Sequence, residues 1–216
     1  MSPFDKLFKI MTKPLVAFIY VSLIVLFFVY FDKPLTSYLY ILDSRHGFPI
    51  LSYVTRLGIG ALYLPTFIIL GLFFRYIRKN YECEARAWFL LLCLFIPSII
   101  CVFLKITLGR ARPSMFFEAQ QYGFYWFQLN PHFWSFPSGH TTTIMGVVMG
   151  LGVVFPRYFY ALLLTGIAVA LSRVLLTHHY VSDVMTATYL TMLEIALILY
   201  VLRRKSWLAP AWDHTV

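Results

Sequence analysis

The chain has 216 residues, of which 60% are hydrophobic and only 12% are charged, and its mean hydropathy is +0.75. So much apolar surface excludes an ordinary water-soluble domain and indicates a protein whose solvent is lipid. The formal net charge is +9, but the basic residues lie in short clusters between apolar runs. Membrane topology explains that pattern better than a nucleic-acid partner does, so we expect no nucleic-acid binding.

The first elements in the chain are a surface helix and a membrane span. Phe4, Leu7, Phe8 and Met11 recur at helical spacing among lysines, so residues 1–13 are predicted to form an interfacial helix. Residues 14–31 carry no charge, and ~20 apolar residues suffice to cross a bilayer. A cleavable secretory signal is the alternative, but the stretch lacks a small-x-small cleavage site, so we predict a retained first span.

Further apolar runs predict further spans, at about residues 57–74, 87–104, 141–155, 158–176 and 184–202. The segment 32–56 mixes charges with leucine and tyrosine and is predicted to be amphipathic. The loop over 113–136 is rich in aromatic residues, which is typical of an interfacial belt, with lipid binding as a second interpretation. Its aromatic residues include Tyr122, Phe124, Tyr125, Trp126, Phe127, Phe133 and Trp134. The expected fold is all-α, a single polytopic membrane domain over residues 1–216 with six transmembrane helices.

The charge distribution predicts the orientation of these spans. Placing the N-terminus, the 75–86 loop, Arg157 and the C-terminus on one side gives that side eleven of the eighteen Lys and Arg residues. By the positive-inside rule this side faces the cytoplasm. Both termini are then cytoplasmic, and three polar motifs emerge together on the outer face, which for a bacterial inner membrane is the periplasmic face.

The first motif supplies cations, with Lys105 at its start and Arg110 and Arg112 at its end. Arg173 of the third motif joins them at the same membrane face. Snorkelling to lipid headgroups explains a single residue of this kind. Four such cations beside two histidines at low dielectric favour an anionic ligand instead. Phosphate fits, because guanidinium groups bind it in bidentate fashion and an ammonium acts as a point charge.

The second motif, Pro137-Ser138-Gly139-His140, opens the fourth span. Gly139 permits close backbone approach, and free N–H groups at a helix N-terminus, aided by the dipole, form an anion site. A Ser N-cap followed by a turn glycine is the alternative interpretation. His140 favours the anion site, because a titratable ring there can move a proton near neutral pH.

The third motif places His179 four residues before Asp183, near the start of the sixth span. An Asp bonded to one ring nitrogen fixes the tautomer and leaves the other nitrogen free to attack. Arg173 can share this site only if the fifth span ends near Leu176. Spacing alone does not separate His178 from His179 as the nucleophile, and simple helix capping is the alternative for Asp183.

Two other chemistries could use the same residues. The histidines and aspartate could hold a metal, but no H-E-x-x-H pattern is present and the cations would oppose a divalent ion, so no metal is predicted. Ser138 could be the nucleophile of a Ser-His-Asp hydrolase. That interpretation lacks the G-x-S-x-G pattern and leaves the cations without a purpose.

Taken in order, the three motifs resemble the signature of the type 2 phosphatidic acid phosphatase (PAP2) superfamily. Its pattern, K-x6-R-P, then P-S-G-H, then S-R-x5-H-x3-D, is matched at every position between Lys105 and Asp183, about a third of the chain. The six-span layout resembles the bacterial membrane branch of that superfamily. The resemblance implies a lipid phosphatase in the inner membrane that needs no metal or other cofactor.

The resemblance also implies a role for each matching residue. Its register selects His179 as the nucleophile that forms a phosphohistidine, with Asp183 orienting the ring and His140 protonating the leaving oxygen. The residues that would hold the phosphoryl oxygens are Lys105, Arg112, Ser138, Gly139 and Arg173.

The expected partners are the bilayer and a lipid phosphate or pyrophosphate substrate. We favour undecaprenyl pyrophosphate, with lipid A, phosphatidylglycerophosphate and phosphatidic acid as alternatives, and we expect selectivity to lie in the outer loops 32–56 and 113–136. A non-catalytic lipid-phosphate binder or transporter is the alternative of another class. The histidines and Asp183 argue against it, because binding needs only the cations. The sequence leaves the oligomeric state open.

Overall fold

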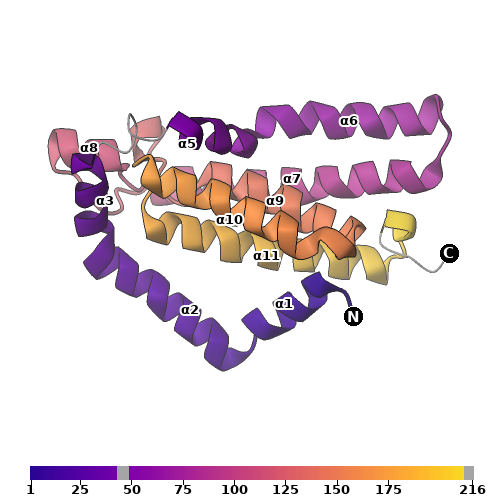
Figure 1. Cartoon of the computed structure of the whole chain (residues 1–216), viewed down its shortest axis with the longest axis horizontal. Coiled ribbons are helices and arrows are strands. Elements are labelled where there is room, and N and C mark those ends of the chain that lie inside the picture. Colours follow the sequence, from indigo (N-terminus) through magenta and orange to yellow (C-terminus); the bar gives the residue numbers. More distant parts are fainter. Residues whose placement is uncertain (43–48, 212–216) are drawn as a thin grey trace.

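A computed structural model describes residues 1–42 and 49–211, so part of the predicted amphipathic segment, residues 43–48, lies outside the described residues. The described chain is built of helices, as the predicted all-α class requires (Figure 1). The helices are α1 (Pro3–Met11), α2 (Pro14–Leu26), α3 (Asp32–Ile41), α5 (Pro49–Val54), α6 (Gly60–Tyr76), α7 (Tyr81–Leu108), α8 (Pro113–Ala119), α9 (Gly139–Val154), α10 (Phe159–Leu175) and α11 (Val181–Arg204). A π-helical turn, η1 (Phe27–Phe31), joins α2 to α3. The 3-10 turns are η2 (Thr55–Gly58), η3 (Pro131–Phe133), η4 (Pro156–Tyr158) and η5 (Ala209–Ala211).

Helix α9 forms the centre of the bundle, with α7, α10 and α11 packed around it (Figure 1). Nearly all of its side chains are buried, as expected of a helix that is apolar all round. Glycines allow its neighbours to approach closely: a Cβ on Gly146 would lie 2.5 Å from the carbonyl oxygen of Cys93 on α7. Such small residues favour close helix packing in a membrane, where lipid is as apolar as the side chains.

Each of the six predicted spans is occupied by a helix, but the lengths differ. The stretches long and apolar enough to cross a bilayer are Pro14–Ile41, Tyr81–Leu108, Pro156–Leu175 and Val181–Arg204, with Pro49–Gly58 and Gly60–Tyr76 as a possible fifth span bent by 41°. Helix α9 has only 16 residues. The first helical stretch continues past the predicted end at residue 31 to Ile41. Asp32, which was expected beyond the span, is buried, with 1% of its surface exposed.

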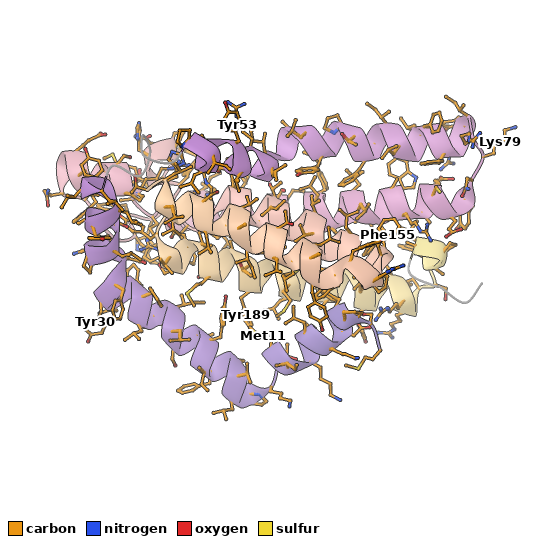
Figure 2. The ribbon with its side chains drawn as sticks, viewed as in Figure 1. Met11, Tyr30, Tyr53, Lys79, Phe155 and Tyr189 are labelled. Atoms are coloured by element: carbon orange, nitrogen blue, oxygen red, sulfur yellow. The ribbon has the colours of Figure 1, made fainter. Side chains whose placement is uncertain are left out.

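The stretch from α2 to α3, here called the first arm, lies away from the bundle where α2 begins and approaches it toward α3 (Figure 1). Helix α2 has no buried residue. The Tyr20 hydroxyl donates to the Met185 carbonyl at 3.1 Å, and its ring stacks on Tyr189 with 5.0 Å between centroids. Figure 2 shows Tyr189 pointing from the bundle into the space beside α2. The arm therefore lies against the bundle through few side chains.

The predicted surface helix over residues 1–13 is found as α1. It begins with a capping box between Ser2 and Asp5, in which the Ser2 hydroxyl accepts from the Asp5 N–H at 3.1 Å. Phe4 is buried against Phe159, and Asp5 pairs with Arg203 at 3.1 Å. This helix therefore packs on the bundle and does not lie only on a membrane surface.

The two ends of the bundle carry different parts of the chain. The α6–α7 connection, the N-terminus and the end of α11 lie toward one end, where Figure 2 also places Lys79 and Phe155. Helices α3, α5 and α8 lie at the opposite end (Figure 1). The three polar motifs lead into this second end, so the bundle separates the predicted cytoplasmic basic clusters from the predicted site.

Candidate active site

The motifs meet because three long helices begin or end at the same place. Helix α7 carries Lys105 in its last turn and stops at Gly109, whose left-handed conformation (φ 57°) lets the chain turn back. Helix α9 begins directly after Ser138. Helix α10 ends at Leu175, as the predicted end near Leu176 requires, so Arg173 and His179 need not lie on one continuous helix.

His179 lies in the turn between α10 and α11 and is 2% exposed. Its Nδ1 is 2.8 Å from the carbonyl oxygen of Ser135. Because a carbonyl can only accept, Nδ1 carries the proton and the lone pair lies on Nε2. Burial lowers the pKa of the ring well below its usual 6.5, and the charges of Lys105, Arg173 and Arg112 lower it further. The ring is therefore neutral near pH 7, as a nucleophile must be.

Asp183 is fully buried and accepts hydrogen bonds through both oxygens. Oδ1 accepts from Arg110, while Oδ2 accepts from the Ser135 hydroxyl at 2.6 Å and from the Tyr180 N–H at 2.9 Å. The Nδ1 of His179 lies 3.6 Å from Oδ2. Asp183 thus does not make the direct hydrogen bond to the ring that the sequence predicted. It holds Ser135, whose carbonyl accepts a hydrogen bond from the ring N–H. The bond to Tyr180 shows that it also caps α11.

Three cations, Lys105, Arg112 and Arg173, surround His179 and are here called the outer charges. Lys105 donates to the Trp134 carbonyl at 2.7 Å, and Arg173 donates to the Thr55 hydroxyl at 2.8 Å. Within residues 1–42 and 49–211, no carboxylate oxygen lies within 4.0 Å of any outer charge. Burial lowers the pKa of the Arg112 guanidinium below its ordinary value. A largely buried group of cations with no described carboxylate in contact favours binding of an anion.

The second motif lies beside these cations. Ser138 is fully buried and makes no side-chain capping bond to α9, so the alternative of a simple Ser N-cap is not what the structure has. A Cβ on Gly139 would lie 3.5 Å from the Cε of Lys105. His140 packs against η2: a Cβ added to Gly58 of that turn would lie 2.8 Å from the Cβ of His140. The outer charges also act electrostatically on His140.

Arg110 differs from the expectation that it faces a phosphate with the other cations. Its side chain is completely buried and bonds Asp183 and Asp32 instead. Burial works to lower the pKa of Arg110, but the two neighbouring carboxylates outweigh burial and raise it. Arg112, two residues further on, has no described carboxylate within 4.0 Å, and its charge acts on both His179 and His140.

Three contributors to the site escaped the sequence analysis: Asp32, Thr55 and Ser135. Asp32 did leave a signal, because it directly follows an uncharged apolar run, and an acid buried at that depth is a functional-site indicator. Ser135 and Thr55 left none. Their roles depend on a backbone carbonyl and a hydroxyl that approach the motifs only in the folded chain.

The aromatic loop divides into two parts. Trp126 and Phe127 are exposed, 57% and 78%, as expected of an interfacial belt. The rings packed around the Arg110 guanidinium, with centroids at 4.5 to 5.7 Å, belong to Phe28, Tyr122, Phe124 and Tyr180. Part of the loop therefore encloses a buried charge and does not face lipid.

The site brings together a neutral buried histidine, a second histidine and three unpaired cations. In the part of the chain that the structure describes, no group of three His, Cys, Asp or Glu side chains is arranged to hold a metal ion. Cations positioned around a nucleophile suit transfer of a phosphoryl group, whose charge builds on its equatorial oxygens. The predicted site residues thus lie together, and their individual roles stay predictions.

Comparison with known proteins gives consistent results. The model of the PAP2 superfamily matches residues 86–207. A lipid A 1-phosphatase of Rhizobium johnstonii is 34% identical over 96 residues, which are 44% of this chain and 39% of that protein. A lipid A 1-phosphatase of Rhizobium etli is 37% identical over 87 residues, which are 40% of this chain and 38% of that protein. The chain thus spans less than half the length of these relatives.

The fold also resembles a solved structure. The crystal structure of a transmembrane PAP2 type phosphatidylglycerolphosphate phosphatase from Bacillus subtilis superposes with a TM-score of 0.56. The match covers 90% of this chain and 98% of that chain, at 18% sequence identity. At this identity the likeness establishes a shared multi-helix membrane fold.

Proposed function

The chain belongs to the PAP2 superfamily, and from that premise we propose that it is a membrane lipid phosphatase working through a phosphohistidine without metal. The observation that carries the proposal is His179, a buried ring whose proton is held on Nδ1 by the Ser135 carbonyl, so that Nε2 keeps the lone pair. Around it stand the outer charges. A binder or transporter would need these cations but not a nucleophile with a fixed tautomer.

The reaction proceeds in two displacements. The Nε2 lone pair of His179 attacks phosphorus, the bond from phosphorus to the lipid oxygen breaks, and protonated His140 gives its proton to that oxygen. Water then attacks the phosphohistidine, the P–N bond breaks, and His140 takes the proton from the water. The outer charges and the N-terminal turn of α9 stabilise the charge on the phosphoryl oxygens in both steps.

An apolar crevice supports a lipid as the substrate. It has a volume of about 290 Å³, and its lining includes Leu171 and Val184, close in sequence to Arg173 and Asp183. Five of the chain's seven methionines line it. Methionine is adaptable and suits a surface that meets hydrocarbon chains of varied shape.

Lipid A is the first substrate to test, because the two curated relatives are lipid A 1-phosphatases. The preference for undecaprenyl pyrophosphate drawn from the sequence stays a prediction, and phosphatidylglycerophosphate and phosphatidic acid complete the panel. For topology we propose six spans, with the bent α5–α6 pair and α9 each crossing the membrane. Both termini then lie in the cytoplasm of a bacterium and the site faces the periplasm.

The deciding experiment measures phosphate release by the purified protein in detergent with excess chelator, across the four lipids. His179→Ala is measured beside His178→Ala, its neighbour in the chain and a matched control. We expect chelator-resistant release that His179→Ala loses by about a thousandfold or more and His178→Ala keeps. The opposite pattern would reassign the nucleophile to His178. No release from any lipid, with binding of orthovanadate intact, would favour a binder or transporter.

A further inference from the structure

The first arm reaches the catalytic residues through one carboxylate. Helix α2 has no buried residue. Asp32, the first residue of α3, is nevertheless buried, with 1% of its surface exposed. Its Oδ2 accepts from Arg110 at 2.8 Å and from the Ser182 hydroxyl, and its Oδ1 accepts from the Ser182 N–H at 3.2 Å. A buried carboxylate is costly unless it is paired and hydrogen-bonded. These bonds therefore hold the arm on α11 at the point where α3 begins.

Arg110 uses the donors of both terminal nitrogens in this arrangement. Nη1 donates to Asp183 and to Ser182 at 2.7 Å. Nη2 donates to Asp32 at 2.8 Å and to the Tyr122 hydroxyl at 3.3 Å. Only its Nε–H has no partner among the described residues, and that atom is buried. A guanidinium bound in this way cannot form a bidentate contact with a phosphate.

The same guanidinium connects the two carboxylates. Asp32 lies on one side of it and Asp183 on the other, and the second oxygen of Asp183 faces Ser135 and His179. Side chains that orient a catalytic group are themselves held by neighbours, and small displacements of a nucleophile slow its reaction strongly. The orientation of His179 thus depends, through Asp183, on where Arg110 is held.

We propose that Asp32 and Arg110 are a positioning pair: they fix Asp183, and through it His179, so that turnover requires the first arm to be docked on the bundle. Neither residue touches the phosphoryl group. The proposal rests on the proposed phosphatase activity and adds to it a role for the first membrane helix.

The proposal predicts a result that distinguishes positioning of His179 from binding of the substrate. Removing the Asp32 charge leaves Arg110 with a single carboxylate and lets the guanidinium and Asp183 move. The outer charges, which would bind the phosphoryl oxygens, keep all their contacts. The turnover number kcat should therefore fall while KM and the affinity for a phosphate analogue remain.

The test uses Asp32→Asn in the full-length protein in detergent. We expect kcat for phosphate release to fall about tenfold to a hundredfold. KM and the dissociation constant of orthovanadate should change by less than about twofold. Tyr30→Phe is the matched control on the same arm, because that ring is 67% exposed and its hydroxyl bonds neither carboxylate. Its kcat should stay within about twofold of the wild type.

A double-mutant cycle tests whether the two residues act as a unit. Arg110→Lys keeps the charge but loses the fork that bridges the two carboxylates. If the pair works through Asp183, the combined variant Asp32→Asn with Arg110→Lys has a kcat no lower than the worse single variant. Losses that multiply would show independent roles and overturn the proposal.

Two further results would overturn it: an Asp32→Asn protein with wild-type kcat, or one that loses kcat and orthovanadate affinity together. Should Asp32→Asn fail to fold, Ser182→Ala applies the same test, since it removes only the hydroxyl between Asp32 and Arg110. Its kcat should fall about fivefold, while its affinity for orthovanadate should stay unchanged.

Wild type and His179→Ala, assayed alongside, separate the proposed phosphatase activity from the proposed positioning pair. An inactive wild type counts against the phosphatase, whereas an active wild type with an unaffected Asp32→Asn counts against the positioning pair alone.

Discussion

Two groups of charge lie side by side at one end of the bundle, and they are built in opposite ways. The inner charges, Asp32, Arg110 and Asp183, are fully buried and bonded to one another. Of the outer charges, Lys105 and Arg173 are buried and Arg112 is half-buried, yet no described carboxylate pairs with any of them. Arg110 and Arg112 are only two residues apart in the chain.

This difference separates what holds the site together from what binds its ligand. A charge whose bonding capacity is used within the protein can fix geometry but cannot bind a substrate. A cation whose donors are not matched by a carboxylate weakens the fold slightly and is ready to bind an anion. His179 lies between the two groups, with its Nδ1 toward the inner charges and with the outer charges acting on its ring.

The largest effect should come from Arg110→Gln, which leaves two buried carboxylates without their cation. Breaking a buried pair in this way costs about 3–5 kcal/mol of folding free energy. The midpoint of thermal unfolding in detergent should fall accordingly. Arg112→Gln, the same change two residues later, should leave that midpoint unchanged or raise it. Equal losses in the two variants would erase the distinction between inner and outer charges.

Arg112→Gln should instead weaken binding. A hydrogen bond to a charged group is worth about 1.5–3 kcal/mol, so orthovanadate affinity should fall about tenfold to a hundredfold. Titration of orthovanadate against the wild type and the variant measures this. An unchanged affinity would remove Arg112 from the phosphate site.

A smaller effect is expected in the pH profile. Burial and the outer charges lower the pKa of His179 below 6.5, so the acid limb of kcat/KM should lie below pH 6.5. Arg112→Gln removes one positive charge and should move that limb to higher pH. Because both proteins use the same lipid, ionisation of the substrate cancels in the comparison. A limb that moves to lower pH, or stays in place, would contradict this electrostatic account.

The same lowered pKa affects stability. Below pH 6.5 an unfolded chain protonates this histidine while the folded protein does not, so the unfolded state binds more protons. Stability from this group is therefore full above pH 6.5 and is lost as pH falls toward the lowered pKa. Thermal midpoints measured over this range should drop less in His179→Ala than in the wild type.

The smallest effect should come from a charge pair far from either group. Asp5 and Arg203 pair at 3.1 Å, with 27% and 42% of their side chains exposed. An exposed pair contributes about 0–1 kcal/mol, so Arg203→Ala should barely move the thermal midpoint. A drop as large as that of Arg110→Gln would mean that burial is not what distinguishes the inner charges.

Much of this protein follows from its sequence because lipid imposes simple rules. A long uncharged run in a membrane must be helical to satisfy its backbone, so the six helical regions were predictable while their exact ends were not. The first span-length stretch, Pro14–Ile41, extends past its predicted end, and α9 stops after 16 residues. Helix ends depend on packing against neighbouring helices as well as on membrane thickness.

The sequence by itself determined that Lys105, Ser138, His140 and His179 would come together, since each stands where an apolar run begins or ends. Only the tertiary structure decided that Arg110 pairs with Asp183 while Arg112 acts on the two histidines, and that Asp32 of the first arm completes the inner charges. Spacing along a chain specifies which side chains reach one end of a bundle. It does not specify which partner each finds there, because hydrogen bonds between residues 73 or 78 positions apart depend on how the helices pack.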